Sequence, residues 1–346
     1  MQSNAIAFNN LIYKSAEDPG FKRIHKGRGF QFLDENGKKI TDPEILQRIK
    51  SLVIPPAWKN VWISPEPEGH VQVRGIDARG RTQYKYHPEW NRMSLVKKFD
   101  RMAAFAKALP SIRKKIKYAL NKDGWPRDKV LALILSILDQ SSIRIGNKIY
   151  EKENGTYGLT TLRRKHLKLT ENGINFEFKA KGGLYRKVHI QGKKITRLIR
   201  ECSELKGHEL FRYLDEDGKS LPVYSQDVND YLREISGEAF TAKDFRTWGG
   251  TVGALELYPE ALAEKAIYVK RSLQICLVKK VAQRLGNTVK ICREYYIHPS
   301  ILNSADQQDF DSVKLLVLAT KKYPELSAQL KPSELIALYI IEKGIK

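Results

Sequence analysis

The sequence changes character at residues 77–88, which read DARGRTQYKYHP. A turn at Gly80 leads into Thr82–Tyr86, where alternate residues are aromatic, the period of two that is typical of a β-strand. From about Pro88 onward, apolar residues recur at helical spacing instead. We therefore predict a domain boundary here, with a small β-rich domain over residues 1–88 and a larger, mainly helical domain over residues 89–346.

The residues before this boundary favour short strands and turns. Gly29–Leu33 and Lys39–Ile40 flank an Asn-Gly pair at residues 36–37, which predicts a β-hairpin. Pro43–Leu52 is predicted to be a short helix capped by Thr41 or Asp42. Two further strands are expected near Val61–Ile63 and Val71–Arg74.

The residues after the boundary predict a helical domain interrupted by strands. A β interlude is expected over Gly158–Ile190, with turns at residues 171–173 and 182–183. The tail over residues 300–346 is predicted to hold two helices from about Asp309 onward, the last capped by Ser333. The fold class is therefore α+β. The other helices are expected at Trp90–Leu109, Ser111–Leu120, Pro126–Gln140, Lys194–Leu205, Gln226–Ile235, Thr241–Leu257 and Pro259–Leu285.

The composition points to a polyanionic partner. Lys and Arg number 61 against 39 Asp and Glu, a net charge of +22, which favours nucleic acid over weak ribosome or membrane association or a basic surface kept for solubility. Three scattered cysteines and seven scattered histidines indicate neither a disulfide framework nor a metal site. No apolar run reaches the roughly 18 residues of a membrane span, and Met1–Asn10 lacks a secretory pattern, so a cytoplasmic protein is expected.

One candidate nucleophile lies in residues 292–299, which read CREYYIHP. The phenol of Tyr296 has an ordinary pKa of about 10, so it attacks well only where cations stabilise its anion or its transition state. Taken alone, a Tyr-Tyr pair near a helix end is more typical of packing than of catalysis.

Three cationic side chains are candidates for that stabilising role. Arg144 directly follows a strongly apolar predicted helix, Lys181 occupies a predicted hairpin turn, and Arg246 lies in a predicted helix that begins near Thr241. Each position also has an ordinary interpretation as a capping residue, a solvated turn or a surface arginine.

Taken together, these residues resemble the type IB DNA topoisomerases. The order Arg144, Lys181, Lys243-x-x-Arg246, Asn287 and Tyr296-Ile-His-Pro is similar to the family pattern, and closest to its compact bacterial and poxvirus-like branch. Two N-terminal stretches are similar to the same branch, residues 54–58 (IPPAW) and residues 77–88. The resemblance covers both predicted domains.

The resemblance implies a role for each of these residues. Tyr296 attacks the scissile phosphodiester and becomes joined to the 3′-phosphate, while Arg144 and Arg246 bind the phosphate oxygens with fixed, always-charged forks. Lys181 matches the general acid that protonates the leaving 5′-oxygen, with Lys179 as a rival. Asn287 stands where many members carry His, and an amide still donates a hydrogen bond although it cannot shuttle a proton.

The resemblance also implies how the protein binds DNA. Two lobes form a C-shaped clamp around duplex DNA, and the chain acts as a monomer at the nucleoid without membrane, metal, nucleotide or other cofactor. Supercoils relax by strand rotation and religation without ATP. The residues that match DNA-contact positions are Arg81, Gln83, Tyr84, Tyr86, Tyr150 and Lys243.

Two other classes of protein remain open at this point. Tyrosine recombinases use similar chemistry, but they usually carry His-x-x-Arg where this chain has Lys243-x-x-Arg246, and they usually begin with a helical domain. A non-catalytic DNA-binding protein on the same fold fits the charge equally well. Such a binder would not require a tyrosine nucleophile.

Overall fold

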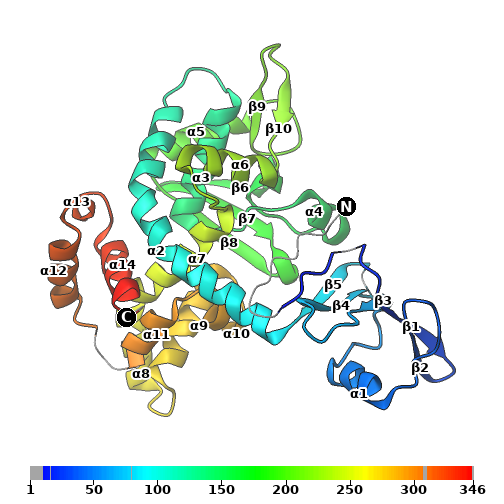
Figure 1. The fold of residues 1–346 in the computed structure, drawn as a ribbon. Coiled ribbons are helices and arrows are strands. Elements are labelled where there is room, and N and C mark those ends of the chain that lie inside the picture. Colours follow the sequence, from blue (N-terminus) through cyan, green and yellow to red (C-terminus); the bar gives the residue numbers. More distant parts are fainter. Residues whose placement is uncertain (1–10, 16, 79, 307–309, 345–346) are drawn as a thin grey trace. The chain divides into compact units, whose positions relative to one another are not determined.

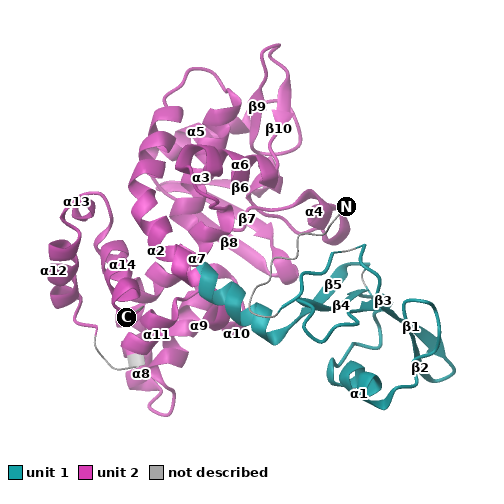
Figure 2. Cartoon of the chain, in the orientation of Figure 1, with its two compact units in different colours: residues 1–98 teal, residues 99–346 magenta. Residues whose placement is uncertain are grey.

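The computed structural model describes residues 11–15, 17–78, 80–306 and 310–344 (Figure 1). The chain forms two compact units, Met1–Lys98 and Phe99–Lys346 (Figure 2). Residue 88, where the sequence predicts a boundary, is the first residue of α2 (Pro88–Ala119), and the units divide further along this helix. The predicted absence of a secretory signal concerns Met1–Asn10, which lie outside the described residues.

The described part of unit 1 is built on a five-stranded antiparallel sheet with the order β2-β1-β3-β4-β5. Helix α1 (Pro43–Ser51) is capped by Asp42, one of the two predicted capping residues, whose carboxylate accepts from the backbone N–H of Glu44 (2.8 Å). The buried core of unit 1 includes Ile49, Ile63 and Val73. The strands are β1 (Phe21–Lys26), β2 (Gly29–Leu33), β3 (Lys59–Ile63), β4 (Val71–Ile76) and β5 (Thr82–Tyr86).

The predicted hairpin around Asn36-Gly37 is confirmed: Leu33 and Lys39 form an antiparallel bridge, and the Ile40 N–H donates to Phe32 O (3.0 Å). Strand β2 also pairs with β1, a strand that was not predicted from the sequence. The residues of β1 are mostly exposed and charged, so their strand conformation depends on tertiary pairing rather than on a local apolar pattern.

Unit 2 is mainly helical, and with the sheet of unit 1 it confirms the predicted α+β class. Its central helix α3 (Arg127–Ser141) carries the apolar run Val130–Leu135, which is completely buried. A helix that is apolar all round must be covered by its neighbours. Here α3 packs against α5 (Lys193–Ser203), α6 (Ser225–Ser236), α7 (Ala242–Glu256), β8 (Tyr185–Ile190) and β9 (Arg212–Leu214).

A second sheet in the described part of unit 2 has the order β6-β7-β8 and forms the predicted β interlude. Its strands β7 (Gly173–Lys179) and β8 are antiparallel and are joined by a turn that contains η3 (Lys181–Gly183). The remaining small elements of this region are η1 (Leu159–Thr161), η2 (Arg164–His166), β6 (Leu167–Thr170) and β10 (Ser220–Pro222), which pairs with β9.

Two helix predictions were wrong in their continuity. The helices expected on either side of Pro110 form the single helix α2, which continues through Pro110 with Leu109 and Ile112 fully buried. The long helix expected over Pro259–Leu285 is two helices, α8 (Tyr258–Ile267) and α9 (Leu273–Leu285). Ser272 starts the second one by accepting from the N–H of Ile275 (3.3 Å).

The C-terminal tail belongs to the core of unit 2. Helix α14 packs against α7, and its Ile336 and Ile340 lie in the same buried cluster as α9. Ser333 lies inside α14 and does not cap it, because the Glu334 carboxylate accepts from the N–H of Lys331 (2.9 Å) instead. The tail helices are α11 (Pro299–Asp306), α12 (Ser312–Lys322), α13 (Pro324–Ser327) and α14 (Pro332–Gly344). None of the helices in the described ranges is long and apolar enough to cross a membrane.

Candidate active site

The candidate site is built around the C-terminal end of α9. The helix ends at Gly286, whose left-handed φ of 60° suits glycine. The N–H groups of Gly286 and Asn287 donate back to Gln283 O (3.2 Å) and Ala282 O (2.9 Å), the hydrogen bonds of a Schellman motif. A helix C-terminus has carbonyl oxygens without partners and a partial negative charge. This end of α9 therefore attracts cationic donors.

Both arginines that the sequence nominated bind there. Arg246 donates from Nη1 to Ser142 O (2.6 Å) and from Nη2 to Leu285 O (2.5 Å), and only 4% of the residue is exposed. Arg144 donates from Nη1 and Nη2 to Gly286 O (3.2 and 3.3 Å). Carbonyl groups of the main chain thus hold both guanidinium groups in place.

Asn287 is joined to the same cluster. Its Oδ1 accepts from Arg144 Nη2. Its Nδ2 is buried and has no hydrogen-bond partner within the described ranges. A buried donor without a partner carries a desolvation cost, so Nδ2 is suited to a ligand that supplies an acceptor.

The candidate nucleophile lies against this cluster. Tyr296 directly follows α10 (Val289–Tyr295) and is half-buried, and its ring centre is 5.1 Å from Arg246 Cζ. Burial lowers the pKa of Arg246 to about 10; Arg144 acts in the same direction, whereas a hydrogen bond with Tyr296 and the charge of its phenolate oppose the shift. Arg246 and Tyr296 therefore interact directly within the site.

Helix α7 carries Arg246 and also packs against the backbone of Tyr296. A Cβ on Gly250 would lie 2.4 Å from Tyr296 O, so glycine permits the close approach. Thr251 Oγ1 donates to Tyr296 O (3.4 Å) and accepts from the N–H of His298 (3.1 Å). Burial lowers the pKa of His298 to about 4, and its neutral Nδ1 accepts from the N–H of Ser300 (3.1 Å).

The structure places Lys181 on the predicted hairpin turn, beside Gly182 and Gly183 with φ of 83° and 79°. Its side chain is exposed and makes no hydrogen bond or ion pair with any described residue. The rival Lys179 is also exposed and is the last residue of β7. Contacts therefore join Arg144, Arg246, Asn287 and Tyr296, whereas Lys181 stands apart from them on the hairpin.

Comparison with known proteins identifies the family. The family model for the catalytic core of eukaryotic DNA topoisomerase I matches residues 87–312, and the model for the N-terminal domain of bacterial DNA topoisomerase IB matches residues 29–77. The chain belongs to the type IB DNA topoisomerases. It is 30% identical to DNA topoisomerase 1B of Acanthamoeba polyphaga mimivirus over 286 residues, which is 80% of this chain and 85% of that protein.

A second relative supports the assignment of this topoisomerase. DNA topoisomerase 1B of vaccinia virus (strain Copenhagen) is 23% identical over 279 residues, which is 77% of this chain and 83% of that protein. Among solved structures, a XerH site-specific recombinase bound to its difH substrate covers 57% of this chain and 49% of its own, with 17% identity and a TM-score of 0.36. The family assignment rests on the sequence matches alone.

The other residues nominated for DNA contact lie on exposed surfaces of the topoisomerase. In unit 2, Lys243 is exposed on α7 and Tyr150 is 51% exposed on α4 (Lys148–Asn154). In unit 1, Tyr84 and Tyr86 share the exposed face of β5, and their ring centres lie 5.9 Å apart. These side chains are available to a ligand.

Arg81 and Gln83 of unit 1 share one acidic partner. Arg81 Nε donates to Asp77 Oδ2 (2.8 Å), and Gln83 Nε2 donates to the same oxygen (3.0 Å). The carboxylate holds both side chains at the start of β5. DNA would have to compete with Asp77 for their donors.

Arg186 of the topoisomerase was not among the residues predicted from the sequence. Its Nη1 donates to Gln283 O (2.9 Å) and its Nη2 donates to Arg284 O (2.7 Å), so it binds the same end of α9 as the other two arginines. A weak signal was present: in β8, Arg186 is in phase with the buried Val188 and Ile190. We call Arg144, Arg186 and Arg246 the arginine frame.

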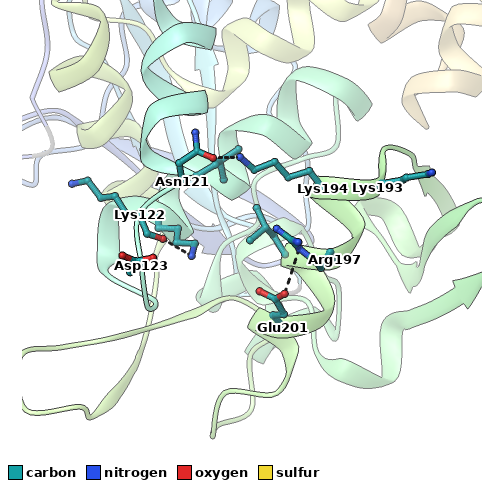
Figure 3. A pocket seen from close by; sticks show the side chains of 10 residues that line it. Asn121, Lys122, Asp123, Lys193, Lys194, Arg197 and Glu201 are labelled. Atoms are coloured by element: carbon teal, nitrogen blue, oxygen red, sulfur yellow. Dashed lines mark hydrogen bonds and ion pairs between the residues drawn. The ribbon is translucent and has the colours of Figure 1, made fainter.

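A pocket of about 550 Å³ lies beside the N-terminal end of α3, the end far from Ser142 and Arg144 (Figure 3). Lysines and an arginine line it, but several already have partners. Lys129 Nζ donates to Lys122 O (2.7 Å) and Gly124 O (2.8 Å), and Arg197 Nε is 3.5 Å from Glu201. We assign no role in the reaction to this pocket.

Proposed function

We propose that Tyr296 is the nucleophile of this type IB topoisomerase and that it forms a transient 3′-phosphotyrosyl bond with one strand of duplex DNA. The observation that carries the proposal is the position of Tyr296 against Arg246, next to guanidinium groups that the backbone of residues 285–286 holds in place. Preorganised cations in a partly dry site stabilise the charge that develops in phosphoryl transfer.

The reaction balances with the residues of unit 2. The Tyr296 oxygen bonds to phosphorus and its phenolic proton passes to solvent, while the bond from phosphorus to the 5′-oxygen breaks. The Lys181 ammonium gives its proton to that oxygen, which leaves as a 5′-hydroxyl. Religation is the reverse reaction, and supercoil torque rotates the free strand between the two steps.

Arg144, Arg246 and Asn287 bind the non-bridging phosphate oxygens in this proposal. The buried Nδ2 of Asn287 supports the role, because the bond that Arg144 donates to Oδ1 leaves the amide donor available. The donors are neutral or positive, so the negative phosphate relieves the mutual repulsion of Arg144 and Arg246, which contributes to the lowered pKa of Arg246 after burial.

Both units contribute DNA contacts in this proposal. Tyr150 and Lys243 contact phosphates near the cleaved bond, and Arg81, Gln83, Tyr84 and Tyr86 reach the major groove. The enzyme acts as a monomer in the cytoplasm, on the nucleoid, and uses neither ATP nor a metal ion. The energy of the broken bond is retained in the phosphotyrosine.

The test is relaxation of negatively supercoiled plasmid in EDTA without ATP, with Tyr296→Phe and the adjacent Tyr295→Phe compared to wild type. Wild type and Tyr295→Phe should relax the plasmid, and Tyr296→Phe should bind it without relaxing it. Denaturing gels of end-labelled DNA should show protein on the 3′ end. If Tyr296→Phe relaxes plasmid like wild type, or the adduct is on the 5′ end, the proposal fails.

A further inference from the structure

Arg186 occupies a position on β8 that an apolar residue would ordinarily take. It pairs with the buried Phe178 of β7, and alternate residues of its strand, Val188 and Ile190, are buried. A charged group in an inward-facing position requires compensating hydrogen bonds. The role proposed above for the catalytic residues leaves Arg186 unused.

The compensation comes from the backbone at the end of α9. Arg186 reaches from the hairpin to Gln283 O (2.9 Å) and Arg284 O (2.7 Å). The contact is close, because a Cβ on Gly286 would lie 2.6 Å from Arg186 Nη1. Two carbonyl groups one residue apart suit the planar fork of a guanidinium, whereas the single ammonium of lysine does not match them both.

This contact directly joins two parts of the candidate site through side-chain hydrogen bonds. The β7–β8 hairpin carries Lys181, five residues before Arg186, while the end of α9 holds Arg144 and Arg246. Among the described residues, the side-chain hydrogen bonds between this hairpin and residues 283–287 all come from Arg186. Without them, the hairpin would lose its side-chain hydrogen bonds to the end of α9, where Arg144 and Arg246 also bind.

We propose that Arg186 is a positioning residue that fixes the β7–β8 hairpin against the end of α9, so that Lys181 reaches the leaving 5′-oxygen. The inference rests on the proposed function, in which Lys181 is the general acid. It follows that loss of Arg186 impairs protonation of the leaving group more than it impairs attack by Tyr296. General acid catalysis contributes on the order of 10² to 10⁴ in rate, so the expected defect is large enough to measure.

The experiment compares two DNA duplexes that differ at one atom. The scissile bond joins phosphorus either to the ordinary 5′-oxygen or to a sulfur in its place. When the bond from phosphorus to sulfur breaks, the sulfur leaves as a thiolate, because a thiol has a pKa of only about 8.5 and needs no proton from the enzyme. Single-turnover cleavage is measured for wild type, Lys181→Ala, Arg186→Ala and Arg186→Lys, with Lys187→Ala as control.

Lys187 is a matched control because it follows Arg186 on the same strand, is exposed and pairs with Glu177 (3.5 Å). Lys187→Ala should cleave both duplexes like wild type. Arg186→Ala should cleave the oxygen duplex about 10²-fold slower and the sulfur duplex within about threefold of wild type, as Lys181→Ala does. With the oxygen duplex, the cleavage rate of Arg186→Lys should lie between the rates of wild type and Arg186→Ala.

The outcomes separate this proposal from the proposed function. If sulfur restores cleavage by Lys181→Ala but not by Arg186→Ala, loss of Arg186 impairs a step other than protonation of the leaving group, and the positioning role is wrong while the proposed function stands. Normal cleavage of the oxygen duplex by Arg186→Ala also overturns the positioning role. If sulfur does not restore Lys181→Ala, the general-acid role fails and the proposal fails with it. Arg186→Lys gives the same readout should Arg186→Ala not fold.

Discussion

The end of α9 and the start of β5 both gather arginine and amide side chains, but they hold them differently. At α9, backbone carbonyl groups anchor the guanidinium groups, and Arg246 is 4% exposed. At β5, Arg81 and Gln83 share the side-chain carboxylate of Asp77, next to a tyrosine that is 47% exposed. In the first arrangement main-chain groups hold the donors, and in the second an acidic side chain holds them.

The difference matches the demands of chemistry and of binding. A catalytic donor is effective only if it costs no reorganisation in the transition state, which favours anchoring to the main chain. A surface that reads DNA must adjust to base edges and water, and each of its contacts contributes modestly. Changes at α9 should therefore affect the rate of cleavage, and changes at β5 should affect affinity.

The largest effect is expected for Gly250→Ala. The new Cβ would lie 2.4 Å from the backbone oxygen of Tyr296, which no side-chain rotation can relieve, so the backbone must shift. A displacement of about 1 Å costs on the order of 10² in rate. Gly253→Ala is the control, since its Cβ would meet the flexible side chain of Arg284 at 3.4 Å. Equal single-turnover cleavage rates for the two variants would contradict the seating of Tyr296 on α7.

A smaller effect is expected for Asn287→Ala. The variant removes the buried donor Nδ2 and the acceptor of Arg144 but keeps the arginines, so cleavage should slow by about 10-fold. Asn287→Asp should be slower still, because it places a negative charge where a phosphate oxygen is proposed to bind. An aspartate variant that cleaves faster than the alanine variant would exclude the donor role.

A substitution at β5 is expected to change the affinity for DNA without changing the rate of cleavage. Gln83→Ala should weaken DNA binding about fivefold, the lower end for one base contact, and leave the cleavage rate at saturating DNA unchanged. Thr82→Ala, on the neighbouring position of β5, is the control. Binding is measured by fluorescence anisotropy at fixed salt, and a loss of rate at saturation would place Gln83 in the catalytic machinery instead.

The smallest effect is expected for the buried His298, which should make the stability of the protein depend on pH. Burial lowers the pKa of His298 to about 4, below the value of about 6.5 in an unfolded chain. The unfolded state therefore binds the proton first, and stability is complete above pH 6.5 and falls as the pH drops toward 4. His298→Asn keeps an acceptor for Ser300 and should lose about 2–4 °C less in Tm between pH 7 and pH 5.

His208→Asn is the control for this measurement, because His208 is exposed. It should follow the wild-type Tm at both pH values in calorimetry. If His298→Asn also follows wild type, the protonation of His298 does not oppose folding.

The sequence alone determined much of this protein. The alternation in Thr82–Tyr86, the apolar run of α3 and the Asp42 cap follow local rules, and they appear in the structure where the sequence predicts them. The resemblance also nominated Tyr296, Arg144, Arg246 and Asn287, which the structure brings together. Local rules did not predict β1 or the break between α8 and α9, because pairing and burial across the fold decide those elements.

Only the tertiary structure decided how the arginines meet. Arg144, Arg186 and Arg246 come from a loop, a strand and a helix, and they converge on the carbonyl groups of residues 283–286 across about 40 to 140 positions of sequence. Backbone carbonyl groups carry no residue identity, so no motif records them as partners. The C-terminal end of α9 supplies the partial negative charge that the arginines bind, whatever its side chains are. Aligned peptide dipoles and unpaired carbonyl groups produce this charge.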